Sequence, residues 1–301
     1  MVQQPVAGPR RNASGLVRDL EILELLSAPE AMPGGLGVLR VAELTGRDKA
    51  VISRSLATLA DSGLLSRDAA TLTYRLGSRL YALAARTAES TLVREARPYL
   101  RKIARHTRET THLSVLRGDN VLTLISELSP YEVRTAAWEG VTTAAWRTPS
   151  GRVLISDWDN ATLGNWYAEH GRDRALVDPV PVIAAARFTV LDPPQPGTSC
   201  IQDLAGMHAE LGRIRRQGFA LSDEELETGV VAASAPVLDF TGRVVAAVNI
   251  SAPKARVGDQ LDKLGIYVAQ AAIPLSRHLG ATEDQLACLR DSTAGRTEPL
   301  L

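Results

Sequence analysis

Basic, hydroxyl and small side chains gather near the start of one expected helix, between Asp48 and Gly63. At about 100° per residue, Ile52, Leu56 and Leu59 form an apolar face, which leaves the opposite face to the polar and small side chains. Arginine, lysine and serine at such a position bind base edges and phosphates in a DNA groove, and alanine lets the backbone come close. The residues of this helix expected to contact DNA are Arg47, Lys49, Ala50, Ser53 and Arg54.

The neighbouring segments complete a recognisable module. A short apolar helix pattern, Val38 to Leu44, precedes a break at Gly46, and Asp48 is well placed to cap the second helix. Two short strand-like runs follow at residues 64–67 and 71–76. Helix, sharp turn, helix and hairpin describe a winged helix-turn-helix, which lays its second helix in the major groove. On the hairpin, or wing, Arg67 and Arg75 are expected to contact DNA as well.

Residues that could catalyse a reaction or hold a metal are scattered. No histidine is spaced with serine, cysteine or acidic residues in a nucleophile motif, and neither a P-loop nor HExxH occurs. Cys200 and Cys288 lie far apart without a CxxC partner, which argues against a zinc site or a disulfide framework and fits a reducing cytoplasm. We expect no catalytic residue, no metal and no cofactor. Distant side chains can still converge in a fold, so a hydrolytic enzyme stays an alternative.

Charge and length bound the possibilities further. The chain has 301 residues, enough for about two domains, and its 34 basic and 34 acidic residues balance. DNA binding must therefore rest on a local patch: residues 10–86 carry eleven basic and eight acidic residues, a net charge of +3. No apolar run reaches the roughly 18 residues of a membrane helix. The first residues lack the apolar stretch of a signal peptide, so we expect a cytoplasmic protein.

Helix patterns flank the module on both sides. Before it, Leu16 to Leu26 places Leu16, Leu20 and Leu23 at helical spacing, with Ile22 and Leu26 as further candidates for the same pattern and Ser14 as the expected N-cap. A Pro- and Gly-rich loop, residues 27–37, separates this helix from the next one. After the wing, residues 78–91 continue as a helix that would connect two domains.

The remaining chain alternates helix and strand patterns. Strands are expected at residues 112–117, 121–126 and 133–138, and again as an antiparallel pair at 230–238 and 243–250. Helices are expected at 93–107, from Pro149 to 155, and at 159–170, 204–217 and 260–279, with an irregular Pro-rich segment at 178–197. Strands flanked by helices predict an α+β domain.

Several stretches resemble one protein family. They are VRDLEILELL in the first helix, VAELTGRDKAVISRSLATLADSGLL with YRLGSRLYAL, ARPYLRKIARHTRETTHLSVLRGDNVLTL, and IRRQGFALSDEELETGVVAASAPVLDFTGRVVAAVNISAP. Together they span about residues 16–280 and resemble the IclR family of bacterial transcriptional regulators. The family often has Ser-Thr where this chain has Ala50 and Val51, which leaves Lys49, Ser53 and Arg54 as the expected readers.

The resemblance implies a domain order and partners. It implies a winged helix-turn-helix, a linker helix and a C-terminal GAF-like α/β effector-binding domain, acting as a homodimer or dimer of dimers on double-stranded operator DNA. The expected division is a disordered leader at 1–13, the DNA-binding domain at 14–77, the linker helix at 78–91, the effector-binding domain at 92–280 and a tail at 281–301, weakly patterned apart from 283–289.

The resemblance also places an effector against the second domain's sheet, near WRTPSGRVLIS and VNIS. Thr148 can cap a helix whose first residue is Pro149, and Ser150 and Gly151 leave backbone amides approachable, which favours an anion such as a carboxylate. Asn249 and Ser251 share one face of their strand and would need polar partners if that face is buried. Trp138 and Trp146 could wall an aromatic ligand, and Ser222 and Ala232 occupy positions that match family ligand contacts.

Each of these assignments has a simpler alternative. Asn249 and Ser251 could bond neighbouring backbone, and tryptophans more often pack in a core. The leading hypothesis is a ligand-controlled repressor of a catabolic operon, with a small organic acid or aromatic effector. The alternative is a sensor that acts through a protein partner, although the clustered arginines argue against a protein-docking face.

Overall fold

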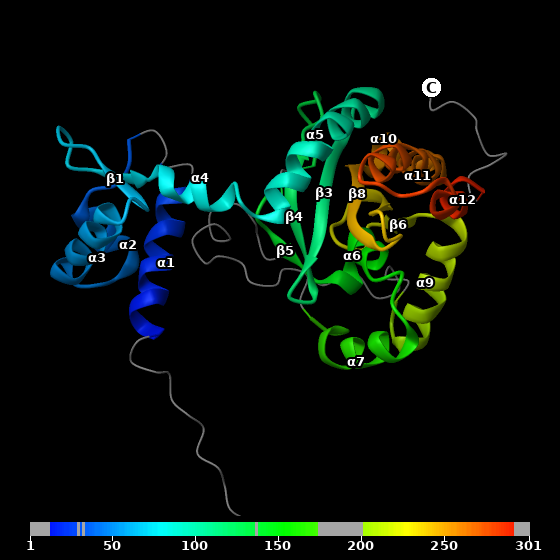
Figure 1. The fold of residues 1–301 in the computed structure, drawn as a ribbon, viewed down its shortest axis with the longest axis horizontal. Helices are drawn as coiled ribbons and strands as arrows, with labels where there is room; N and C mark the ends of the chain where they lie inside the picture. Colours follow the sequence, from blue (N-terminus) through cyan, green and yellow to red (C-terminus); the bar gives the residue numbers. More distant parts are fainter. Residues whose placement is uncertain (1–12, 29–30, 32–33, 136–137, 174–200, 292–301) are drawn as a thin grey trace, which may run out of the picture. The chain divides into compact units, whose positions relative to one another are not determined.

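The computed structural model describes residues 13–28, 31, 34–135, 138–173 and 201–291, and Figure 1 shows their fold. They form two compact units, one ending at Thr91 and the other beginning at Leu92. Each unit is described by itself. The leader, the irregular segment predicted at 178–197 and the last ten residues lie outside the described ranges.

The first unit has the predicted order of helix, turn, helix and hairpin. Gly46 has a left-handed backbone (φ 62°), which allows the sharp turn between the second and third helices. Leu36 bridges to Tyr74 and so adds a third short segment to the wing sheet. The elements are α1 (Ala13–Ser27), α2 (Val38–Thr45), α3 (Lys49–Asp61), β1 (Leu65–Arg67), β2 (Tyr74–Leu76) and α4 (Ser78–Ala84).

The core of the first unit confirms one predicted helix face and corrects another. Ile52, Leu56 and Leu59 of α3 are buried together with Val41 of α2. In α1, however, the buried residues are Ile22, Leu25 and Leu26, whereas the predicted core residues Leu16 and Leu20 are 65% and 47% exposed. The N-terminal half of α1 therefore extends beyond the core of its own unit. Leu44, also predicted to be buried, is 47% exposed, and α1 begins at Ala13, so Ser14 is not its N-cap.

The predicted linker helix at 78–91 is wrong as a single element. α4 ends at Ala84, and α5 (Ala88–Thr107) begins a new helix that runs across the boundary between the two units. The Thr87 hydroxyl accepts a hydrogen bond from the Ser90 amide (3.2 Å), as an N-cap residue does. This cap starts α5 separately, which helical periodicity alone does not reveal.

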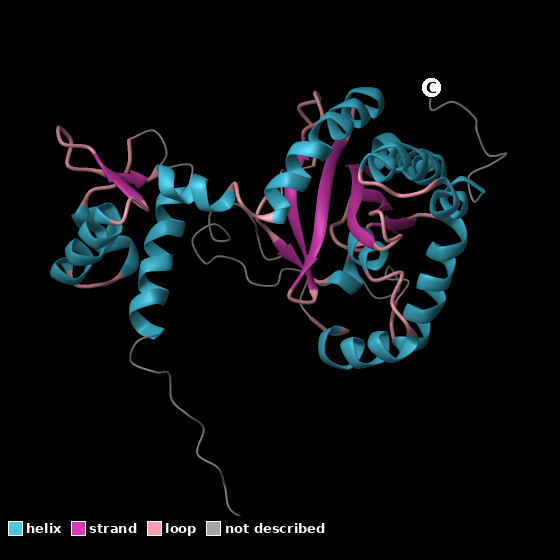
Figure 2. Cartoon of the chain, in the orientation of Figure 1, coloured by secondary structure: helices cyan, strands magenta, loops and turns pink. Residues whose placement is uncertain are grey.

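The second unit is built on one antiparallel sheet, whose strands are drawn in magenta in Figure 2. Its strand order is β5-β4-β3-β8-β7-β6. Strands β3 and β4 form the predicted hairpin, whose turn residues Gly118 and Asp119 both have positive φ. Strands β7 and β8 form the predicted antiparallel pair. The strands are β3 (Thr110–Arg117), β4 (Asn120–Glu127), β5 (Thr142–Thr143), β6 (Ala220–Asp223), β7 (Val230–Leu238) and β8 (Val244–Pro253).

Helices cover both faces of this sheet. On one face, α5 and α11 (Leu261–His278) pack against apolar side chains such as Leu113, Val248 and Ile250. On the other face pack α6 (Pro149–Leu154), α7 (Asn160–His170) and α9 (Leu204–Gln217). Successive side chains of a strand point to opposite faces of the sheet. His112 and Asn249, which are next to Leu113 and Val248 in the sequence, therefore belong to the second face. The short elements are η1 (Ala145–Arg147), α10 (Lys254–Val257) and η2 (Gly258–Gln260).

Two predicted boundaries in this unit need correction. The described part of 133–138 is not a strand. Side-chain hydrogen bonds hold it instead: Arg256 donates to the Val133 carbonyl (3.2 Å), and the Thr135 hydroxyl donates to the Ser251 carbonyl (3.3 Å). The tail does not begin at 281, since α12 (Glu283–Asp291) packs Leu286 and Leu289 against the domain. None of the described helices combines the length and hydropathy needed to cross a membrane.

Candidate DNA-binding surface and effector cavity

The start of α3 presents the predicted DNA-contacting surface. The Asp48 carboxylate accepts hydrogen bonds from the amides of Ala50 (2.8 Å) and Val51 (3.2 Å), so it caps the helix as expected. Lys49, Ala50 and Arg54 are exposed, and Ser53 is half-buried. Within the described residues, neither Lys49 nor Arg54 forms an ion pair. These side chains are therefore available to a ligand outside the protein.

The other three predicted arginines already have protein partners. Arg47 binds Glu21 of α1, with a nitrogen–oxygen distance of 2.7 Å. On the wing, Arg75 lies 3.4 Å from Asp68, and the Arg67 guanidinium lies 5.7 Å from the centre of the Tyr74 ring. All three remain at least partly exposed. Contacts of this kind orient a side chain but also compete with DNA for it.

A polar cavity lies in the second unit, on the sheet face covered by α6. The space open to the centres of water-sized molecules is about 80 Å³, several times what one water needs. Eight of the ten predicted effector residues line it: Trp138, Thr148, Pro149, Ser150, Ser222, Ala232, Asn249 and Ser251. Residues from separate strands and a helix therefore converge on one site, although their role in ligand binding stays a prediction.

The two remaining predicted residues do not line the cavity. Trp146 donates from its indole nitrogen to the Asp173 carbonyl (3.1 Å) and packs within the second core. The Gly151 amide donates to the Thr148 hydroxyl (3.1 Å), so it is not open to an anion. A Cβ at Gly151 would lie 2.1 Å from the Ala145 carbonyl oxygen. The glycine is thus required for close backbone packing rather than for ligand approach.

His112 is the most informative lining residue that the sequence did not indicate. Its two ring nitrogens lie 2.9 Å from the hydroxyl oxygens of Ser126 and Ser251. Burial lowers the pKa of His112 to about 4, so the ring is neutral near pH 7. The Ser251 hydroxyl also lies 2.7 Å from that of Thr135. Other lining residues missed by the sequence are Ser114, Val121, Thr123, Thr143, Leu226, Glu227 and Val230.

The two polar residues predicted on β8 differ in how they are satisfied. The Ser251 hydroxyl has protein partners in His112 and Thr135, as the simpler alternative expects. The Oδ1 atom of Asn249 is buried and has no hydrogen-bond partner among the described residues. A buried amide oxygen without a partner costs about 1–3 kcal/mol. A donor group inside the cavity would remove this cost.

A buried ion-pair cluster lies beside the cavity. Arg152 of α6 is fully buried and binds the Glu225 carboxylate through two nitrogens (2.5 and 3.1 Å). Glu210 of α9 lies 3.8 Å from the same guanidinium. Arg152 thereby links α6 and α9 to the segment that contributes Leu226 and Glu227 to the cavity wall.

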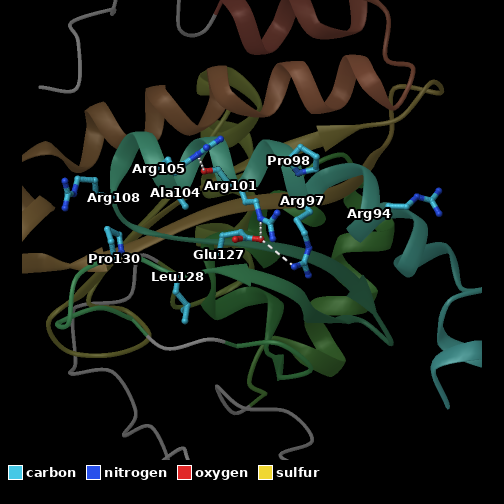
Figure 3. A pocket seen from close by; sticks show the side chains of 10 residues that line it. All are labelled: Arg94, Arg97, Pro98, Arg101, Ala104, Arg105, Arg108, Glu127, Leu128 and Pro130. Atoms are coloured by element: carbon cyan, nitrogen blue, oxygen red, sulfur yellow. Dashed lines mark hydrogen bonds and ion pairs between the residues drawn. The ribbon is translucent and has the colours of Figure 1, made fainter. Parts of the chain in front are cut away.

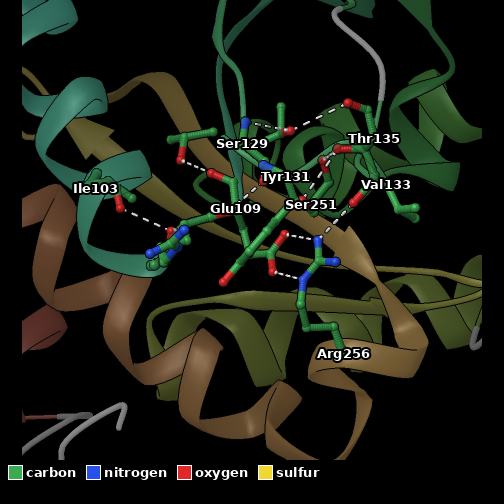
Figure 4. Close-up of polar contacts among 12 residues, drawn as sticks. Ile103, Glu109, Ser129, Tyr131, Val133, Thr135, Ser251 and Arg256 are labelled. Carbon is green, nitrogen blue, oxygen red and sulfur yellow. Dashed lines mark hydrogen bonds and ion pairs between the residues drawn. The ribbon is translucent and has the colours of Figure 1, made fainter.

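An aromatic and charged cluster lies beside Thr135 and Ser251, two residues that line the cavity (Figure 4). Arg256 binds Glu109 through both nitrogens (2.5 and 2.8 Å), and its guanidinium lies 4.5 Å from the Tyr131 ring centre. The Ser129 hydroxyl donates to the Arg108 carbonyl (2.6 Å). These contacts fix the irregular segment after β4, which brings Thr135 to the cavity.

Two family models match the chain. One describes the IclR helix-turn-helix domain and matches residues 15–69; the other describes the C-terminal domain of the bacterial transcriptional regulator IclR and matches residues 84–175 and 189–277. The chain belongs to the IclR family. It is 28% identical over 271 residues to the HTH-type transcriptional regulator BhcR of Paracoccus denitrificans, covering 89% of this chain and 88% of BhcR.

Solved structures of IclR proteins share the fold. The Thermotoga maritima IclR structure has a TM-score of 0.67 at 22% identity, covering 89% of this chain and 99% of that one. An IclR homologue from Microbacterium hydrocarbonoxydans, complexed with 4-hydroxybenzoate, has a TM-score of 0.68 at 20% identity, covering 89% and 100%. With a winged helix-turn-helix and a C-terminal domain of this family, the chain is a ligand-responsive DNA-binding regulator.

Proposed function

We propose that this IclR-family chain is a repressor of a catabolic operon, and that a small aromatic or organic acid changes its affinity for its operator. The observation that supports a hydroxylated effector is the buried Oδ1 of Asn249, a residue that lines the cavity, because this atom has no hydrogen-bond partner among the described residues. A phenol or alcohol hydroxyl can donate to it, whereas a carboxylate cannot. The hydroxyls of Thr148, Ser150 and Ser222 are available as donors to a carboxylate.

The test compares two probes that differ by one hydroxyl. The structural relative complexed with 4-hydroxybenzoate makes this acid the first probe, and benzoate is its matched control. We expect 4-hydroxybenzoate to raise the melting temperature of the protein more than benzoate does, since a ligand that binds only the folded state stabilises it. Asn249→Ala should remove the difference between the probes, and Trp146→Phe, outside the cavity, should keep it. Equal responses of Asn249→Ala and the unmodified protein would contradict this role of Asn249.

The same proposal assigns DNA contacts to α3 and the wing. Lys49, Ser53 and Arg54 read the major groove, Ala50 allows close approach, and Arg47 turns from Glu21 to a phosphate. Arg67 and Arg75 contact the backbone from the wing. Binding of the promoter region beside its own gene, measured by fluorescence anisotropy with and without effector, tests both affinity and the sign of regulation.

The chain is further proposed to work as a homodimer or a dimer of dimers in the cytoplasm, without an enzymatic activity of its own. Leu16, Val17 and Leu20 on α1 are 65%, 52% and 47% exposed, and such apolar surface favours association. Two copies would place two recognition helices on a partly palindromic operator. A screen for hydrolase turnover with purified protein tests the enzymatic alternative.

A further inference from the structure

Five arginines line an open groove of about 820 Å³ along α5 (Figure 3). The first four lie in α5 at intervals of three or four residues, which places them on one face of the helix, and the fifth, Arg108, directly follows the end of α5 with a positive φ. The other side of the groove is formed by the end of β4 and the segment after it, including Glu127, Leu128 and Pro130. The arginines are Arg94, Arg97, Arg101, Arg105 and Arg108.

Packing of α5 determines which way this face points. Ala96, Leu100 and Ile103 are buried against the sheet and α11, so the arginine face is directed to solvent. The side chains of Arg94 and Arg101 keep 71% and 57% of their surface exposed. The row is therefore fixed by the core of the domain, and its charged ends are exposed although two carboxylates contact three of them: Glu95 lies 3.1 Å from Arg94, and Glu127 lies beside Arg97 and Arg101.

The groove is far more basic than the rest of the chain. Residues 10–86 carry a net charge of +3 in a protein whose total is zero, so residues 87–301 carry −3. Within the described lining of the groove, Glu127 is the only acid. It lies 3.2 Å from Arg101 and 3.8 Å from Arg97, and it cannot neutralise five guanidinium groups. A row of positive charge on a domain that is acidic on average attracts anions, so it favours binding of an anionic partner.

We infer that this groove binds the phosphate backbone of duplex DNA, as a second contact besides the winged helix. The inference rests on the DNA-binding function and adds a site to it. The planar guanidinium matches phosphate in a two-pronged geometry. From Arg94 to Arg105 the helix rises about 17 Å at 1.5 Å per residue. At roughly 3.4 Å of duplex per phosphate on one strand, that length corresponds to about five phosphates.

A protein partner fits the groove less well. A protein partner would have to present several carboxylates in one row, because guanidinium groups buried in an interface need paired charges, whereas duplex DNA carries a phosphate at every step. The groove also lies along α5, which is separated from α4 by only three residues and is therefore close in sequence to the DNA-binding module. DNA held by that module is therefore present at high local concentration.

The experiment uses the full-length protein and a fluorescent 40-base-pair duplex of mixed sequence, titrated at several KCl concentrations. The groove variant carries Arg97→Gln, Arg101→Gln and Arg105→Gln, and the control carries Arg117→Gln, Arg216→Gln and Arg243→Gln, which remove equal charge elsewhere on the same unit. We expect the slope of log affinity against log salt to fall by up to about 2.7 in the groove variant, at about 0.9 per lost phosphate contact. At 150 mM salt its affinity should fall at least about tenfold, while the control keeps its slope.

A second variant predicts a gain. Glu127→Gln removes the carboxylate that pairs with Arg97 and Arg101, so it should tighten DNA binding and steepen the salt dependence. A groove variant indistinguishable from its control would overturn the inference. So would a groove variant that keeps its DNA salt slope but loses binding to poly-glutamate, since that result assigns the groove to an acidic protein. Absence of DNA binding by the unmodified protein would instead refute the function on which the inference rests.

Discussion

The arginines of the predicted DNA-contacting surface differ in their ion-pair partners within the protein. Arg47 is bound by Glu21 at 2.7 Å, whereas Arg54 is exposed and has no ion-pair partner within the described residues. DNA must compete with a carboxylate for Arg47 but not for Arg54. We therefore assign sequence discrimination chiefly to Arg54 and a positioning contact to Arg47.

Arg54→Ala should weaken binding to the operator more than binding to unrelated DNA. A lost contact to a base edge costs about 1–3 kcal/mol, or roughly five- to 150-fold in affinity. Anisotropy titrations with both DNAs at one stated salt concentration measure the ratio. Arg40→Ala, on the exposed face of α2, is the control. Equal losses on both DNAs would make Arg54 a phosphate contact instead.

His112 predicts a dependence of stability on pH. Burial lowers its pKa from 6.5 to about 4 in the folded protein. As the pH falls from 6.5 towards 4, the unfolded chain takes up a proton that the folded chain does not, so the free energy of unfolding decreases. The loss is at most about 3 kcal/mol. Above pH 6.5 this contribution is fully present.

Urea unfolding at pH 7.0 and pH 4.5 measures this contribution. The decrease at low pH should be smaller in His112→Gln, which cannot titrate, than in the unmodified protein. His106→Gln, whose exposed ring stacks on Tyr267, should behave like the unmodified protein. Identical pH dependence in His112→Gln and the unmodified protein would show that His112 does not carry the effect.

At the scale of elements, Gly151 decides whether α6 can lie against η1. A side chain there would meet the Ala145 backbone at 2.1 Å, and backbone cannot rotate away as a side chain can. Gly151→Ala should therefore destabilise the protein by at least about 1–3 kcal/mol. Gly164→Ala in α7, where nothing lies within 4 Å, should stabilise it by about 0.5–1 kcal/mol. Urea unfolding of both variants checks the opposite signs.

The N-cap of α3 makes a second prediction for an element. Asp48→Ala removes hydrogen bonds to the amides of Ala50 and Val51 at the end of the helix that we propose contacts DNA. The expected loss is about 1 kcal/mol of stability, with Asp48→Asn keeping most of it. Thermal unfolding of the two variants distinguishes a cap from a general charge effect, because both remove the same charge.

Local signals in the sequence were sufficient for most helices and hairpins. Gly46 and Asp48 mark the turn and cap of the DNA-binding module, and Gly118 with Asp119 marks the β3–β4 hairpin. The break between α4 and α5 was not predicted, because no proline or glycine marks it in the sequence. The signal is the side chain of Thr87, which caps the start of α5. Residues 133–138 have strand-like composition, but a side chain from another element, that of Arg256, binds the backbone at Val133.

The candidate cavity was predictable only where one element carried several of its residues. Asn249 and Ser251 alternate on β8, and Thr148 to Ser150 are consecutive. His112 and Thr123 lie on different strands, each among several other polar residues, and only the pairing of β3 with β4 and β8 brings them to the site. Trp146 was misassigned because an aromatic near a site in sequence can equally pack in the core.

At the scale of the whole molecule, the exposed apolar side chains of α1 predict self-association. Replacing Leu16 and Leu20 with glutamate should shift the protein towards the monomer in sedimentation experiments, and it should weaken operator binding through loss of the second recognition helix. Phe240→Glu, at a 72% exposed residue between β7 and β8 of the second unit, serves as the control. An unchanged oligomeric state in the α1 variant would exclude this surface from the interface.

The arginine groove on α5 also has a consequence for handling the protein. The chain has a net charge of zero and a sequence pI near 7.0, yet the groove concentrates positive charge while residues 87–301 are acidic on average. Molecules without net repulsion but with opposite local charges attract one another, and salt screens that attraction within about 10 Å at 0.1 M. We expect the protein to be least soluble near pH 7 at low ionic strength and to redissolve when salt is added, a salting-in that light scattering across a KCl series would reveal.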